Sequence, residues 1–195
     1  MMTQQQALEV LARRRGEQVV VTTMTSAGLW PKLSESPLDF AYIPSAMGHA
    51  PGLGLGLALA TGRGVIVVNG DGCMLMNLGS LVTLAQHPAP VYLLILDNGL
   101  YEVTGGQPHA GAGRVNYAEM ARAAEIRRVY TFDTLEAWEK EAGDAISGPG
   151  PVVVWLKVEG RLGQKTPKPP RPMSEQIARL RDALNVRTSC EPAPK

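Results

Sequence analysis

The stretch GDGCMLMNLGSLVTLAQHPAPVYLLILDN, residues 70–98, decides the fold. It follows the apolar run VIVV after one residue, Asn69, and it contains a second apolar run, VYLLIL, which is followed by Asp97 and Asn98. Short apolar runs without polar alternation indicate strands buried on both faces, and the segment between them has a helical pattern. A strand–helix–strand unit of this kind predicts two parallel strands whose carboxyl ends meet at one edge of a sheet.

The alternation of strands and helices continues on both sides of this unit. We expect further strands at residues 18–24, 38–43, 129–132 and 152–158, and helices that begin after Thr3 and cover residues 47–60, 74–86, 117 onward, 135–146 and 174–184. This order predicts an α/β fold, with three α/β/α layers around a mainly parallel sheet. Residues 1–164 are expected to form the domain, and residues 165–195 a proline-rich connector, a helix and a tail.

Composition excludes several classes of protein. The 195 residues carry a formal net charge of +1, which gives no electrostatic case for binding nucleic acid or an anionic membrane. The two cysteines, Cys73 and Cys190, have neither a metal-ligand spacing nor the pattern of a disulfide framework. The first residues have no apolar signal region, and the longest apolar stretch, GLGLGLALA, is too short to span a bilayer. A cytoplasmic protein is therefore expected.

Two oxygen-bearing residues follow the two strands of the central unit. Asp71 stands between glycines where the first strand ends, and Asn98 stands where the second ends. A carboxylate and an amide oxygen suit Mg²⁺, which completes its shell with phosphate oxygens and water, and the N–H groups of Gly72 and Cys73 suit an anion. Taken alone, either residue beside glycine is commonly a turn residue. The segment also lacks the third glycine of a dinucleotide fingerprint and the Gly-Lys-Ser/Thr of a P-loop.

The spacing between Asp71 and Asn98 favours a binding site over two unrelated turns. GDG, then 25 residues, then Asn98 resembles the diphosphate–magnesium motif of thiamine diphosphate enzymes. The segment SAMGHAPGLGLGLALA, residues 45–60, is similar to the corresponding segment of the decarboxylase and acetolactate synthase branches. TGGQ at residues 104–107 resembles the phosphonopyruvate and sulfopyruvate decarboxylases. The resemblance covers residues 40–158 and implies thiamine diphosphate and Mg²⁺ as cofactors.

This resemblance assigns roles to individual residues. Asp71, Asn98 and the backbone carbonyl of Leu100 would bind the metal. Asp97 replaces the first Asn of a common Asn-Asn pair and is expected to stay clear of the metal, and His109 receives no role. The implied cofactor site consists of Ser45, Met47, Gly70, Asp71, Gly72, Cys73, Asn98, Leu100, Tyr101 and Thr104.

The resemblance also implies two catalytic candidates. Met47 would be the apolar wedge that holds the cofactor bent, with its N–H and the Ser45 carbonyl on the aminopyrimidine edge. His49 is a candidate contact to the diphosphate or the substrate, although a lone histidine near a helix start is more often structural.

One required part is missing from the chain. In this family, the glutamate that activates the cofactor lies on a separate pyrimidine-binding domain, and residues 1–44 are too few to form one. The chain is therefore expected to be the diphosphate-binding subunit of an oligomeric, two-subunit enzyme. Non-oxidative decarboxylation of a small 2-oxo acid, such as sulfopyruvate or phosphonopyruvate, is the expected reaction.

Other functions stay open. An acetolactate-synthase-like carboligase subunit would use the same half-site, and a non-catalytic cofactor-binding module would keep the fold without turnover. A ferredoxin-dependent 2-oxo acid oxidoreductase is disfavoured, because the cysteines of its cluster are absent.

Overall fold

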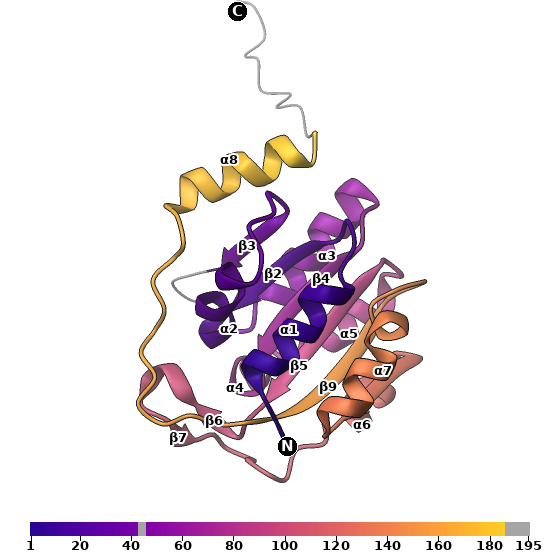
Figure 1. Ribbon diagram of the computed structural model, residues 1–195. Helices are drawn as coiled ribbons and strands as arrows, with labels where there is room; N and C mark the ends of the chain where they lie inside the picture. The colour runs from indigo at the N-terminus through magenta and orange to yellow at the C-terminus, as the bar shows by residue number, and fades with distance from the viewer. Residues whose placement is uncertain (43–45, 186–195) are drawn as a thin grey trace, which may run out of the picture.

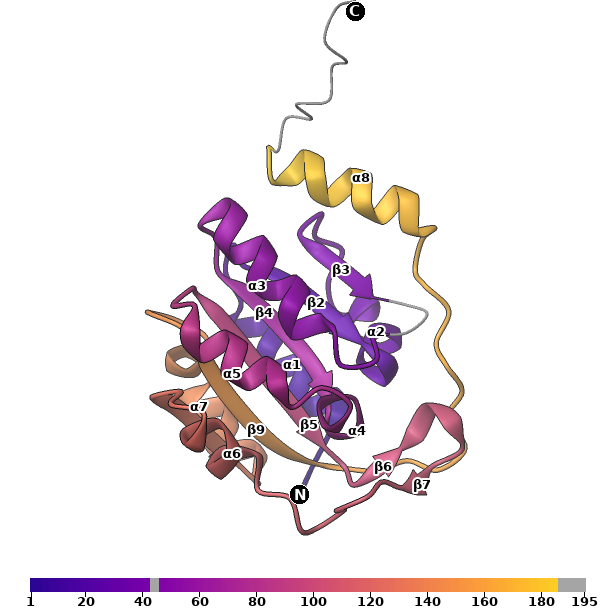
Figure 2. The same ribbon diagram turned by 180° about the vertical axis from the view of Figure 1, so that it is seen from behind.

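The structure is a computed structural model that describes residues 1–42 and 46–185. A twisted sheet forms the middle of the molecule, and helices cover both of its faces (Figures 1 and 2). The predicted three-layer α/β/α arrangement is confirmed. No described helix combines the length and the apolar composition needed to cross a membrane.

The sheet has seven strands in the described residues, in the order β1-β9-β5-β4-β2-β3, with β8 also paired to β9. All of these neighbours are parallel. The strands are β1 (Met2–Thr3), β2 (Val19–Thr23), β3 (Asp39–Tyr42), β4 (Val65–Gly70), β5 (Val91–Asp97), β8 (Arg128–Phe132) and β9 (Val152–Glu159). The two apolar runs of the central unit are the neighbouring strands β4 and β5, and both are buried as expected. Of the expected strand 38–43, Ile43 lies outside the described residues.

Helices divide between the two faces of the sheet. One face carries α1 (Gln4–Arg14), α2 (Met24–Leu29) and α7 (Leu135–Ala145), and the other carries α3 (Ala50–Thr61), α5 (Gly79–Gln86) and α6 (Tyr117–Ala123). Thr3 caps α1 as predicted, since its hydroxyl accepts the N–H of Gln6 at 3.2 Å. Gly54 lets α3 lie directly on β4, because a Cβ there would be 2.4 Å from Val67 Cγ2.

Two predicted helices differ from the observed ones. The helix expected at residues 74–86 is split into α4 (Asp71–Leu75) and α5, and between them the Asn77 amide donates to the Gly48 carbonyl at 3.1 Å. The helix expected from Met47 begins only at Ala50. Met47 and Gly48 have φ angles of 39° and 82°, which are left-handed and incompatible with an α-helix.

A short hairpin follows β5 and was not predicted. Its strands are β6 (Leu100–Tyr101) and β7 (Gln107–Pro108), joined by the 3₁₀ turn η2 (Glu102–Thr104). A second 3₁₀ turn, η1 (Trp30–Lys32), extends α2. The hairpin lies beyond the carboxyl ends of the strands (Figure 1).

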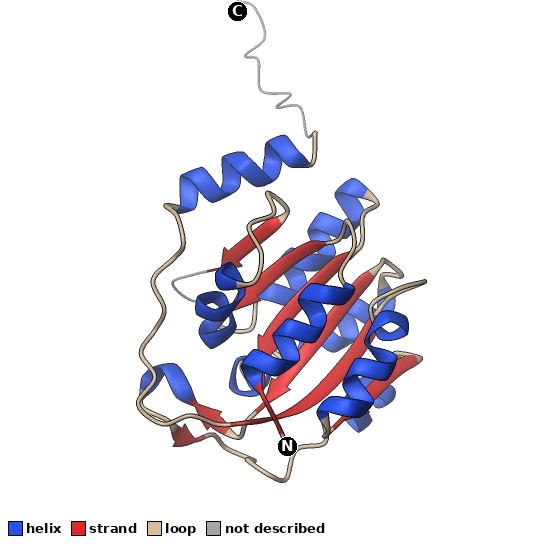
Figure 3. Cartoon of the chain, viewed as in Figure 1, coloured by secondary structure: helices blue, strands red, loops and turns tan. Residues whose placement is uncertain are grey.

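The C-terminal helix α8 (Met173–Ala183) follows an extended connector and lies beside β3 (Figure 3). The buried side chain of Gln176 fixes this position: its Oε1 accepts the N–H of Ala41 at 2.9 Å, and its Nε2 donates to the Arg171 carbonyl at 3.1 Å. Because β3 is the last strand of the sheet, α8 covers a sheet edge. The division of the chain at residue 164 stays a prediction.

Candidate functional site

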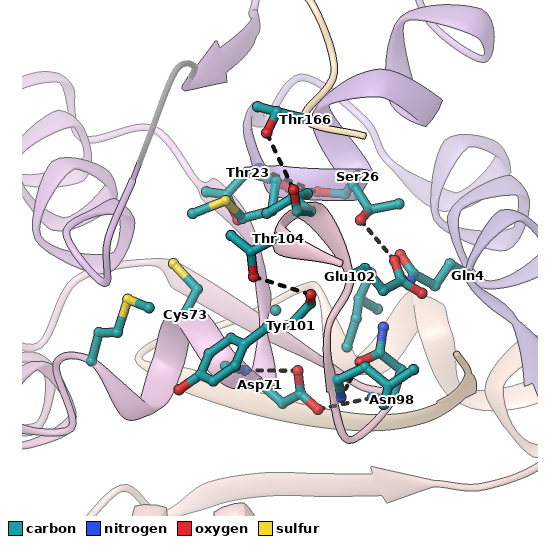
Figure 4. Close-up of a pocket in the computed structure, with 18 of the residues that line it drawn as sticks. Gln4, Thr23, Ser26, Asp71, Cys73, Asn98, Tyr101, Glu102, Thr104 and Thr166 are labelled. Atoms are coloured by element: carbon teal, nitrogen blue, oxygen red, sulfur yellow. Dashed lines mark hydrogen bonds between the residues drawn. The ribbon is translucent and has the colours of Figure 1, made fainter. Parts of the chain in front are cut away.

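A cavity of about 620 Å³ lies at the carboxyl ends of β4 and β5. Ligands of open parallel sheets bind at this edge, and the volume is in the usual range for a small-molecule pocket. Figure 4 shows Asp71, Asn98 and Tyr101 near one another, with Glu102 beside Gln4. The lining comprises Gln4, Thr23, Met24, Thr25, Ser26, Met47, Gly70, Asp71, Gly72, Cys73, Met76, Leu96, Asn98, Leu100, Tyr101, Glu102, Val103, Thr104, Gln107 and Thr166.

The structure brings most of the predicted site residues together at this cavity. Nine of the ten residues in the implied cofactor site line it: Met47, Gly70, Asp71, Gly72, Cys73, Asn98, Leu100, Tyr101 and Thr104. Ser45, the tenth, lies outside the described residues. His49 lines a separate cavity of about 110 Å³ with Asn77 and Ser80, so the structure does not bring it to the same pocket as Met47.

Asp71 is the most heavily bonded side chain of the site. Its Oδ1 accepts the N–H of Gly72 at 2.7 Å, and its Oδ2 accepts the N–H groups of Asn98 at 3.0 Å and Gly99 at 2.6 Å. Burial and, after it, the neighbouring carboxyl group of Asp97 together raise the pKa of Asp71 to about 6, against the lowering effect of the backbone N–H groups. The Asp71 carboxyl group therefore binds its proton more tightly than a carboxyl group in water does.

His109 lies behind this carboxylate. Its Nε2 is 3.0 Å from Asp71 Oδ2, and its Nδ1 is 3.1 Å from the carbonyl oxygen of Ala110. Both partners are hydrogen-bond acceptors, so the His109 ring is the donor in whichever of these contacts is a hydrogen bond. The sequence assigned no role to His109, because it follows a glycine-rich loop whose path cannot be read from spacing.

Asp97 lies close to Asp71, and the expectation that it stays clear of the metal stays a prediction. One carboxylate oxygen of Asp71, one of Asp97 and one ring nitrogen of His109 lie within 4.8 Å of one another. The cause is the parallel register, in which Gly70 pairs with Leu96, so the next residue of each strand is brought to its neighbour. Asp97 also accepts the indole N–H of Trp155 at 2.8 Å.

Two different groups of candidate metal ligands therefore meet at Asp71. The predicted partners Asn98 and Leu100 line the cavity, whereas Asp97 and His109 are not part of its lining. A carboxylate oxygen has two lone pairs, so Asp71 Oδ2 is saturated by its contacts and Oδ1 keeps one. Asn98 Oδ1 likewise keeps one, since it accepts a single bond, from Leu100 N–H at 2.9 Å. Asp71 and Asn98, which both line the cavity, thus each keep an oxygen lone pair available for a hard cation.

Two packing contacts shape the cavity wall beside Asp71. The Tyr101 ring lies over Gly72, where a Cβ would come within 2.5 Å of a ring carbon, so a larger residue at position 72 would displace the ring. The thiol of Cys73 accepts the N–H of Gly48 at 3.1 Å, and burial raises the pKa of Cys73. This thiol is consequently a poor nucleophile and serves as a packing group.

Met47 occupies an unusual backbone conformation at the rim. Its φ of 39° is left-handed, and its side chain is 49% exposed although it lines the cavity. Met24, at the start of α2, has a φ of 49° and also lines the cavity. Left-handed non-glycine residues cost about 1–2 kcal/mol each and concentrate at functional sites. Two of the four such residues in the described chain face the same pocket.

Glu102 is a second site residue that the sequence did not reveal. It is 4% exposed, and its carboxylate accepts hydrogen bonds from Gln4 Nε2 at 2.9 Å, Thr25 Oγ1 at 2.7 Å and Arg161 N–H at 2.8 Å. These donors come from α1, α2 and the segment after β9. Glu102 therefore ties the hairpin over the cavity to three separate parts of the domain.

Comparison with known protein families gives a match over most of the chain. Residues 18–156 match the family model described as "Thiamine pyrophosphate enzyme, C-terminal TPP binding domain". The matched range contains β2 to β5 and the whole of the Asp71 to His109 region.

Curated relatives share moderate identity with the chain. A phosphonopyruvate decarboxylase of Streptomyces viridochromogenes is 38% identical over 145 residues, which is 74% of this chain and 36% of that protein. A sulfopyruvate decarboxylase subunit beta of Methanocaldococcus jannaschii is 40% identical over 107 residues, 54% of this chain and 56% of that protein. The chain thus spans about a third to a half of these relatives.

A solved structure has the same fold. A chain reported as a thiamin diphosphate-dependent enzyme from Mycobacterium smegmatis superposes with a TM-score of 0.68 at 24% identity. The superposition covers 82% of this chain and 32% of that chain.

Proposed function

Because the chain belongs to the thiamine pyrophosphate enzyme family, as a C-terminal TPP-binding domain, we propose that it is the diphosphate-binding subunit of a two-subunit decarboxylase. Its cofactors would be thiamine diphosphate and Mg²⁺, and its substrate a small 2-oxo acid resembling sulfopyruvate or phosphonopyruvate. The names of the curated relatives support this substrate class. When bound, the cofactor supplies the electron sink that lets a 2-oxo acid lose CO₂.

The observation that carries the proposal is the meeting of Asp71 and Asn98 on one cavity. Each follows a neighbouring parallel strand and lines the cavity, and each retains an unused oxygen lone pair. These donors fit Mg²⁺, which takes one or two protein oxygens together with phosphate oxygens. Asp71, Asn98 and the Leu100 carbonyl would hold the ion, and a bound cation would keep the Asp71 carboxyl group ionised despite its burial.

Other residues of the chain would position the organic part of the cofactor. The ring of Tyr101 and the hydroxyl of Thr104 line the cavity from the hairpin. The Met47 side chain, which is half-exposed and lines the cavity, would press against a bent cofactor. His49 lines a different cavity, so we propose no contact between His49 and the substrate.

The need for a partner is supported by one exposed surface. Helix α3 exposes Gly52, Gly56 and Leu59, the last with 58% of its surface accessible, and these residues offer only apolar atoms and backbone. Small residues allow close packing of a neighbouring chain, and exposed apolar patches mark interaction sites. A subunit with a pyrimidine-binding domain, docked here, would bring the catalytic glutamate. A relative that is itself called subunit beta agrees with this division of labour.

Calorimetry tests the cofactor assignment. Thiamine diphosphate should bind to the chain in the presence of Mg²⁺, and Asp71→Ala should abolish this binding, because the ion loses its anionic ligand. Asp133→Ala, at an exposed aspartate outside the cavity, is the matched control and should leave the affinity unchanged. Unchanged affinity in Asp71→Ala would remove the assignment.

Reconstitution tests the two-subunit part. The chain alone should show no 2-oxo acid decarboxylation, and adding a pyrimidine-domain subunit at fixed cofactor and Mg²⁺ should restore it. Robust CO₂ release by the purified single chain would contradict the proposal.

A further inference from the structure

A second cavity, of about 180 Å³, lies at the edge of the sheet that is formed by β3. It is enclosed by β2, β3 and η1 on one side and by the connector and α8 on the other. No described residue lines both this cavity and the one at Asp71. Its polar lining includes Thr22, Trp30, Ser34, Asp39, Arg171 and Arg179.

Two buried polar atoms of this lining lack a partner among the described residues: the hydroxyl oxygen of Thr22 and the indole nitrogen of Trp30. The two residues are 0% and 1% exposed. Thr22 pairs with Ala41 across the sheet, and strand alternation places its side chain on the same face as Ala41, which also lines the cavity. Buried polar groups are nearly always hydrogen-bonded, so these two atoms point to an occupant.

Positive charge remains available around the cavity. Asp39 is already neutralised, because it pairs with Arg15 and also accepts a bond from Ser34. Arg179 makes one long contact, 3.4 Å, with the Glu35 carbonyl oxygen. Arg171 pairs with Glu175 at 3.1 Å, but both side chains are more than 40% exposed, and such surface pairs are weak. Glu35, which is exposed, is the other acidic residue of the lining.

We propose that this cavity binds a small oxyanion, a carboxylate, phosphate or sulfate group, between the body of the domain and α8. An indole N–H and a guanidinium group donate hydrogen bonds and accept none, so the ligand must be rich in acceptors. Thr22 and Trp30 belong to the body, whereas Arg171 and Arg179 belong to the connector and α8. A bound oxyanion would therefore bridge the two parts and strengthen the docking of α8 on β3.

Indole N–H signals in nitrogen-15 NMR spectra of the full chain give a direct test. The chain has three tryptophans. Trp138 already donates to the Ala7 carbonyl at 3.0 Å and serves as the internal control, whereas Trp155 donates to Asp97 at 2.8 Å, beside Asp71, and would report anion binding at the other cavity. Titration with sodium acetate, phosphate or sulfate, at constant ionic strength set with sodium chloride, should move the Trp30 signal saturably. The Trp138 signal should stay in place, and Trp30→Phe assigns the responding signal.

Variants separate a built site from nonspecific ion binding. Thr22→Val and Arg179→Gln should each weaken the responding anion by about tenfold or more, the usual loss for a hydrogen bond to a charged group. Arg181→Gln, at an exposed arginine on the same helix outside the cavity, should leave the affinity unchanged. The anion that saturates first identifies the oxyanion class. The inference would be overturned by the absence of a saturable Trp30 shift with all three anions, as for a water-filled cavity, or by equal affinities in Arg179→Gln and Arg181→Gln.

Discussion

Asp71 Oδ2 and His109 Nε2 lie 3.0 Å apart, and His109 supports this carboxylate without itself lining the cavity. The parallel strands β4 and β5 deliver Asp71 to the cavity, and a histidine from the loop after the hairpin holds it there. His109 is 4% exposed, and its Nδ1 lies 3.1 Å from the Ala110 carbonyl oxygen, so both ring nitrogens have a polar contact that orients the ring. Such outer contacts orient the residues that bind metals.

Replacing this histidine should weaken cofactor binding. His109→Ala leaves Asp71 without one of its four partners, and loss of an outer contact of this kind typically costs 10–100-fold in metal affinity, so about that loss is expected here. Calorimetry with thiamine diphosphate and Mg²⁺ measures it, with circular dichroism as a check on the fold. His87→Ala, at an exposed histidine, is the control. Equal affinities in the two variants would show that His109 does not position Asp71.

The buried Asp71 carboxyl group should make the stability of the cofactor-free chain depend on pH. Its pKa is about 6 in the folded chain and near 3.8 otherwise, so the folded state holds the proton more tightly. The resulting stabilisation is present below the lower value and is lost as the pH rises through the higher one, by about 3 kcal/mol. Denaturant unfolding between about pH 4 and pH 6 should show this loss relative to Asp71→Asn, which cannot titrate. A difference in unfolding free energy that is independent of pH would contradict the assignment.

Met47→Ala isolates the side chain from the backbone strain, because alanine is as disfavoured as methionine at a φ of 39°. The thermal midpoint should therefore change little. In the reconstituted enzyme, turnover should fall more than the Mg²⁺-dependent cofactor affinity, since a wedge acts on cofactor shape. Met120→Ala, at an exposed methionine outside the cavity, provides the reference. Full activity in the Met47 variant would exclude the wedge role.

Two glycines of α3 should respond in opposite ways to the same substitution. Gly54→Ala places a Cβ 2.4 Å from Val67 Cγ2 and should destabilise the chain by about 1–3 kcal/mol. Gly56→Ala meets no atom within 4 Å and should stabilise the helix by about 0.4–1 kcal/mol. Denaturant unfolding of both variants measures the difference. Similar effects at the two positions would mean that α3 does not rest on β4 as described.

The sequence predicted those parts of the site that follow from strand endings. Apolar runs located β4 and β5, and the parallel arrangement then brought Asp71 and Asn98 to one edge. The same logic, carried one residue further, would have placed Asp97 beside Asp71, since Gly70 pairs with Leu96. That neighbour was missed because the family motif, rather than the register, was used to judge Asp97.

Residues supplied by loops and by distant helices could not be predicted in this way. Glu102 is buried because Gln4, Thr25 and Arg161 converge on it, and no spacing along the chain encodes that convergence. The break between α4 and α5 has a similar origin, because Asn77 bonds to Gly48 rather than continuing the helix. Local propensity gave way to tertiary contacts at both places.

The hydrogen bond from Ala41 N–H to Gln176 bears on how readily the protein aggregates at high concentration. An open edge strand is a template on which other chains add further strands, and β3 is such an edge. With α8 in place, part of that edge is occupied by a side-chain amide and shielded by a helix. A chain cut before Met173 would keep every described residue that lines the Asp71 cavity but lose this cover. The C-terminal helix therefore acts as a guard against aggregation, whatever else it binds.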